Sequence, residues 1–88
     1  MGRVLATYRV TPSTTDADLK ALAQQVRQSM PAEAVLRGIQ IEDIAYGLRA
    51  LLLAVEMPDA GGIQDTIERN LQGLPHVETV EVLDADLI

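Results

Sequence analysis

The polar side chains that could catalyse a reaction are few and scattered along the chain. His76 is the only histidine, and it stands where a helix is expected to give way to a strand. Two carboxylate pairs, Glu42-Asp43 and Asp84 with Asp86, have the residue type needed for general acid–base catalysis, but no neighbouring residue ties them to a pocket. We therefore interpret His76 as a loop or partly buried structural histidine and both carboxylate pairs as solvated surface.

Nucleophilic and phosphate-binding patterns are equally weak. Ser13 and Ser29 have no evident base beside them, as a nucleophile would need. The glycines Gly61-Gly62 are followed by Ile63-Gln64 instead of the lysine and hydroxyl residue of a phosphate-binding loop, so they predict a turn and a helix start. An acylphosphatase needs an arginine in a glycine-bearing anion loop, and the segment 11–14 has neither residue.

Composition narrows the class of partner. The 88 residues carry a net charge of −6 with only two aromatic residues, which argues against nucleic-acid binding by phosphate neutralisation or base stacking. A partner would more naturally be a protein with a neutral or basic surface. The absence of cysteine excludes disulfides, thiolate metal sites and CxxC redox centres. A chain with one histidine also cannot form a histidine-rich metal site, and we expect no metal or cofactor. The longest apolar run, Ala50–Val55, is too short to span a membrane, and we expect a soluble, cytoplasmic protein.

Hydrophobic periodicity predicts four strands and two helices in the order βαββαβ. Thr15 followed by Asp18 is a capping-box candidate just ahead of the first helix. The expected segments are a strand at Arg3–Val10, a helix at Leu19–Met30, a strand at Ala34–Ile41, a strand at Leu48–Glu56, a helix at Ile63–Leu74 and a strand at Val77–Leu83.

Two interlocked βαβ halves of this kind predict an α+β, ferredoxin-like plait. Right-handed crossovers then place both helices on one face of a four-stranded antiparallel sheet with strand order 4-1-3-2. In the third strand, the bulkier residues Leu51, Leu53 and Val55 should face the helices. The set Ala50, Leu52 and Ala54 should then form an apolar patch on the open sheet face, which would serve as a binding surface or a dimer face.

The segment Ala45-Tyr46-Gly47-Leu48 is a landmark that connects the whole chain to a known family. Taken with the other ordered segments, it resembles archaeal elongation factor 1-beta, the guanine nucleotide exchange domain family. The segments that carry the resemblance are Gly2–Ala6, Arg9–Pro12, Asp16–Leu19, Ile44–Leu51, Pro58–Gly62 and His76–Val82.

The resemblance implies a single exchange domain over residues 1–88 that binds elongation factor 1-alpha and speeds GDP release without covalent chemistry. It implies partner contacts at Tyr46 and Gly47, where the family usually has a phenylalanine between small residues; the alternative is a tyrosine packed in the core or hairpin. The penultimate position of relatives tends to be basic and reaches toward the magnesium site. Here it is Leu87, followed by Ile88, so displacement by charge is in doubt.

Two other classes of function stay open from the residues alone. A ferredoxin-like domain could bind a small molecule and dimerise through its open sheet face, or it could be an acylphosphatase, although the missing arginine loop disfavours the latter. An exchange factor should instead be a monomer when free and form a one-to-one complex with its GTPase.

Overall fold

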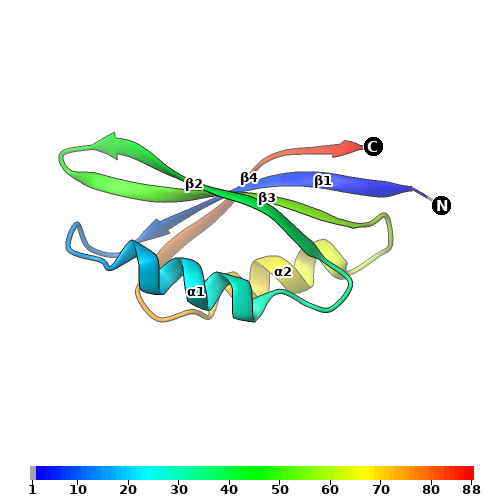
Figure 1. Ribbon diagram of the computed structural model, residues 1–88, viewed down its shortest axis with the longest axis horizontal. Coiled ribbons are helices and arrows are strands. Elements are labelled where there is room, and N and C mark those ends of the chain that lie inside the picture. The colour runs from blue at the N-terminus through cyan, green and yellow to red at the C-terminus, as the bar shows by residue number, and fades with distance from the viewer. Residues whose placement is uncertain (1) are drawn as a thin grey trace.

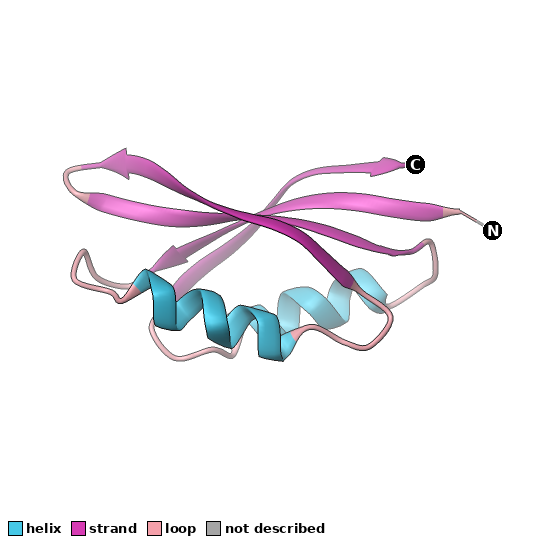
Figure 2. Ribbon diagram, in the orientation of Figure 1, coloured by secondary structure: helices cyan, strands magenta, loops and turns pink. Residues whose placement is uncertain are grey.

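The computed structural model describes residues 2–88 and confirms the predicted βαββαβ order (Figure 1). All neighbouring strands are antiparallel, and their order in the sheet is β2-β3-β1-β4, as expected from the sequence. Both helices lie on one side of the sheet, and the other side carries none (Figure 2). The elements are β1 Arg3–Pro12, α1 Leu19–Ser29, β2 Val35–Ala45, β3 Leu48–Pro58, α2 Ile63–Gln72 and β4 Val77–Leu87.

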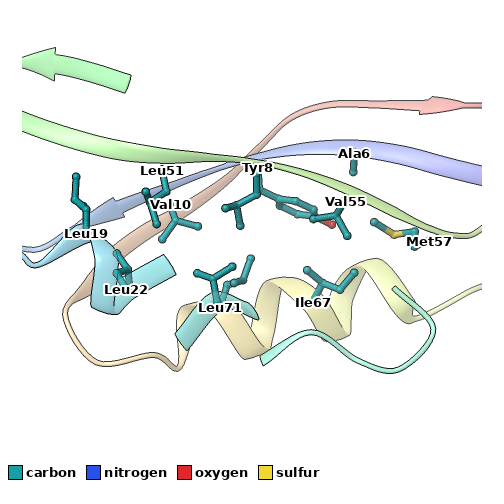
Figure 3. Close-up of a cluster of buried hydrophobic side chains, with 12 residues drawn as sticks. Ala6, Tyr8, Val10, Leu19, Leu22, Leu51, Val55, Met57, Ile67 and Leu71 are labelled. Carbon is teal, nitrogen blue, oxygen red and sulfur yellow. The ribbon is translucent and has the colours of Figure 1, made fainter. Parts of the chain in front are cut away.

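The core lies between the two central strands and the helices (Figure 3). Because side chains alternate across a strand, every second residue of β1 and β3 points to the helices, and those residues are buried. The prediction for Leu51, Leu53 and Val55 is therefore confirmed: each has at most 1% of its surface exposed. The matching residues on the other strand and on the helices are Ala6, Tyr8, Val10, Leu22, Val26, Ile67 and Leu71.

Tyr8 is the one aromatic residue in this core. Its ring is fully buried, and its hydroxyl has no hydrogen-bond partner among residues 2–88. Burial, followed by the nearby carboxylates Glu68 and Asp65, raises the pKa of the Tyr8 hydroxyl to about 12. Because its side chain faces the helices, Tyr8 is not available for base stacking on the open sheet face.

Several predicted strand ends are wrong because the real strands run further. β2 continues past Ile41 to Ala45, and β4 continues past Leu83 to Leu87. The residues of these extensions are half-buried or exposed, so neither extension has a buried face that alternates with a solvent face. Backbone pairing holds them in the sheet, and backbone pairing leaves no hydrophobic signature in a sequence.

Helix α1 is capped by Asp18 and not by the predicted Thr15. The Asp18 carboxylate accepts hydrogen bonds from the backbone N–H groups of Lys20 at 3.1 Å and Ala21 at 3.2 Å. This side chain satisfies N–H groups that have no partner within the helix. The cap also fixes where the loop after β1 ends, and that loop borders a groove described below.

Candidate partner-binding surface

The turn between β2 and β3 presents Tyr46 to solvent. Tyr46 and Gly47 are the two central residues of the hairpin, and both have positive φ, 53° and 80°. Positive φ at both central residues is the requirement of a type I′ turn, which suits the twist of the flanking strands. The Tyr46 side chain is fully exposed, so the alternative of a core tyrosine is wrong.

This placement of Tyr46 is unfavourable for the isolated chain in two ways. A bulky L-residue in the left-handed region costs roughly 1–2 kcal/mol compared with a right-handed conformation. The exposed ring gains no burial in return. Strained residues that persist without local compensation are found at binding and catalytic sites more than elsewhere, so Tyr46 is the first candidate for a contact with a partner.

Two further apolar side chains lie in the same hairpin. Ile41, the last residue of the predicted strand, is 55% exposed, and Ile44, in the part of β2 beyond that prediction, is 43% exposed. The sequence analysis did not predict that the side chains of these two isoleucines are exposed on the surface. The available signal was the hairpin landmark itself, since a strand that must reach a turn at Tyr46 has to include Ile44.

The C-terminal residues occupy the opposite end of the sheet from the hairpin (Figure 1). Leu87 pairs with Val4 in the ladder, and the backbone N–H of Ile88 donates to the Arg3 carbonyl at 2.9 Å. Their side chains are 69% and 64% exposed. The tail is therefore a fixed part of the sheet edge that presents two apolar side chains, and it is not a loose extension.

The predicted partner-binding residues thus form two separate places. Strand β3 has eleven residues and connects the hairpin to the end of the sheet that holds Leu87. At about 3.3 Å per residue, the two places are roughly 33 Å apart. A small molecule cannot touch both, whereas a protein surface can.

Ion pairs cross the open face of the sheet. Arg9 on β1 donates to Glu42 Oε1 on β2 at 2.9 Å and to Glu81 Oε1 on β4 at 3.5 Å. The hydrogen bond to Glu42 is the main cause that raises the pKa of the Arg9 guanidinium. Ala50 on this face is fully buried, and Leu52 is half-buried. Ala50 therefore does not contribute to the apolar patch expected on this face, where Arg9 lies opposite Leu52 in the pairing of β1 with β3.

A second cluster of charges lies on the same sheet. Glu56 on β3 accepts hydrogen bonds from Arg37 on β2, at 2.7 and 2.9 Å, and from Arg3 on β1. These hydrogen bonds, the one from Arg37 first, lower the pKa of the Glu56 carboxyl. Each arginine joins β3 to a different neighbour, so the cluster ties three strands together.

The remaining polar residues that were candidates for catalysis or metal binding do not lie together in one site. His76 is exposed in the loop before β4, with φ 67°. Asp84 and Asp86 are exposed on β4, and Glu42 is engaged by Arg9. Within residues 2–88, no three His, Cys, Asp or Glu side chains come together as metal ligands would. No helix in that part of the chain has the length and apolar character to cross a membrane.

Comparison with known proteins identifies the family of the chain. The EF-1 guanine nucleotide exchange domain family matches residues 5–88. A relative named Elongation factor 1-beta from Methanoregula boonei is 39% identical over 87 residues, covering 99% of both chains. Another of that name from Archaeoglobus fulgidus is 34% identical over 88 residues and covers both chains completely. The ACT domain from GTP pyrophosphokinase of Chlorobium tepidum has a TM-score of 0.64 at 20% identity, covering 90% of this chain and 96% of that one, which supports the fold alone.

Proposed function

Because the chain belongs to the EF-1 guanine nucleotide exchange domain family, we propose that it accelerates the release of GDP from elongation factor 1-alpha during translation elongation. It acts in the cytoplasm as a single domain, is a monomer when free and forms a one-to-one complex with the GTPase. It needs no cofactor and catalyses no covalent step. The observation that carries this proposal, beside the family, is a fully exposed Tyr46 held at the tip of a tight hairpin.

Exchange requires that the chain bind the nucleotide-free GTPase more tightly than the GDP-bound form. A thousandfold acceleration needs a preference of about 4 kcal/mol. Burying a large side chain contributes on the order of 1.5–3 kcal/mol, so Tyr46 and a few neighbours can provide this preference. Gly47 lets the backbone turn at φ 80° so that the tyrosine ring projects from the tip.

The second contact is the apolar end formed by Leu87 and Ile88. A leucine cannot attract a magnesium ligand by charge, so this end acts by occupying space against the GTPase. The pairing of β4 with β1 supports such a role, because a side chain on a paired strand keeps its position during docking.

The test follows the release of a fluorescent GDP analogue from the cognate elongation factor 1-alpha. We expect fast release with the chain, at least tenfold slower release with Tyr46→Ala, and unchanged release with Tyr46→Phe, which keeps the ring. Leu87→Ala should slow release about fivefold, since roughly 1 kcal/mol of apolar contact is lost; Leu83→Ala, another exposed leucine of β4, is its control. If release at micromolar chain equals spontaneous release, the proposed exchange function is wrong.

A further inference from the structure

A groove of about 490 Å³ lies between α1 and the β2–β3 hairpin. Its apolar floor consists of Ala23 on α1, Ile39 and Ile41 on β2, and Leu51 on β3. Ile41 is more than half exposed there, whereas Leu51 belongs to the buried core (Figure 3). We call this feature the hairpin groove.

Three cations line the hairpin groove: Lys20 and Arg27 from α1, and Arg49 from β3. All three residues are exposed, and among residues 2–88 none of them forms an ion pair. The other three arginines of the sheet, Arg3, Arg9 and Arg37, each pair with a glutamate. Within the described part of the chain, the charges of the groove cations are therefore not neutralised by an ion pair.

The charge of the hairpin groove is opposite to that of the rest of the molecule. Asp18 is the single carboxylate among the residues that line it, and this carboxylate already caps α1. The groove thus carries a net charge of +2 in a chain of net charge −6, so the remainder of the chain carries −8. Such an asymmetry repels an anionic partner everywhere except at the groove and so orients its approach.

We propose that the hairpin groove receives an acidic segment of the GTPase that also carries apolar side chains. The cations fit its carboxylates and the aliphatic floor fits its apolar side chains. Arg49 stands only three residues after Tyr46, so one partner surface can cover both. This inference rests on the proposed exchange function and adds to it the chemistry of the docking site. It also limits the argument from net charge, which favoured a neutral or basic partner and could not see local placement.

RNA is the competing anionic partner, and the groove suits it less well. Single-stranded nucleic acid is held by aromatic side chains on which the bases stack. Among the described residues, those that line the hairpin groove include no aromatic, and its floor is aliphatic. Three cations would neutralise few phosphates, whereas they match a short run of acidic side chains.

The chain offers a matched pair of variants for the test. Arg27 and Arg69 are both exposed, both lie in the last turn of a helix and neither forms an ion pair within residues 2–88. Only Arg27 lines the groove. Arg27→Glu and Arg69→Glu therefore make the same change in net charge and the same change near a helix end, so they should alter folding stability equally.

The measurement is the Kd of each variant for nucleotide-free elongation factor 1-alpha at low and high salt. At about 50 mM salt, we expect Arg27→Glu to raise the Kd about three- to tenfold and Arg69→Glu to leave it within about twofold. The difference should disappear near about 0.5 M salt, where charges are screened over a few ångströms. The rate of GDP release is recorded on the same samples.

Equal Kd values for the two variants would overturn the groove proposal, and they would leave the exchange function standing if the wild-type chain still speeds GDP release. Binding that depends on Arg27 without any acceleration would support the groove and reject the exchange function. Binding of tRNA to the free chain is measured as a further control. If Arg27→Glu abolishes this tRNA binding but leaves GTPase binding unchanged, the groove is a phosphate site and the proposal is wrong. A wild-type chain that does not bind the GTPase would overturn both.

Discussion

Replacing Tyr46 by asparagine should make the protein more stable and less active. The change places Asn-Gly at the hairpin tip, the pair that type I′ turns prefer. Asparagine tolerates the left-handed conformation that Tyr46 adopts at φ 53° better than a bulky residue does. Since Tyr46 is fully exposed and its ring loses no packing, we expect a gain of about 0.5–1 kcal/mol in the free energy of unfolding.

The same substitution removes the ring that the GTPase is proposed to bury. A loss of roughly 100 Å² of apolar contact at about 25 cal/mol per Å² is about 2.5 kcal/mol. That free energy corresponds to roughly a 70-fold weaker interaction with the transition state for GDP release. Stability and exchange should therefore change in opposite directions at one residue.

Thermal unfolding and GDP release measure the two effects on the same preparation. For a domain of this size the expected gain raises Tm by about 2–8 °C. Tyr46→Phe is the control, because it keeps both the ring and the strained conformation and should change neither quantity. A lower Tm for Tyr46→Asn would refute the argument from backbone strain. Unchanged GDP release would refute the contact.

Two further predictions concern the folded chain alone. Tyr8→Phe should keep or slightly raise the unfolding free energy, by up to about 1 kcal/mol, because it removes a buried hydroxyl without a partner. The pKa of Tyr8 rises from 10 to about 12 on folding, so wild-type stability is full below pH 10 and falls as the pH rises toward 12; urea unfolding should show that this fall is reduced in Tyr8→Phe. The pKa of Glu56 is lowered on folding, so its contribution is full above the unfolded value of 4.5 and is lost as the pH falls through the lower folded value. When the urea midpoint of unfolding is plotted against pH, Glu56→Gln should reduce the fall of the midpoint at acid pH, whereas Glu78→Gln, a change at an exposed residue, should leave that fall unchanged. An equal fall in the two variants would show that the arginine contacts of Glu56 do not stabilise the fold.

The sequence predicted the parts of the fold that are set by burial. The βαββαβ order and the right-handed crossovers placed β3 in the centre of the sheet, and the set Leu51, Leu53 and Val55 indicated which side of β3 faces the helices. The extensions of β2 and β4 could not be predicted in the same way, since none of their residues is buried. Their pairing is specified by the partner strand and not by their own composition.

The candidate site was predicted unevenly for a related reason. Tyr46 was identified by its resemblance to a family, and the structure added the positive φ and the full exposure that make it a strained, unsupported residue. The hairpin groove was not predicted, because Lys20, Arg27 and Arg49 are separated along the chain and meet only when α1 packs beneath the hairpin. The net charge of a whole sequence cannot reveal which charged residues cluster in the folded structure.

The contrast between the two tyrosines gives the protein a pair of built-in optical reporters. The chain has no tryptophan, so its intrinsic fluorescence comes from Tyr8 and Tyr46 alone. Tyr8 is sealed in the core and Tyr46 is open to solvent. A small quencher such as acrylamide should thus dim Tyr46 and spare Tyr8 in the folded chain. The Tyr8 emission that remains in the presence of the quencher therefore reports folding. Protection of the Tyr46 emission from the quencher, when a tyrosine-free segment of the partner is added, reports docking.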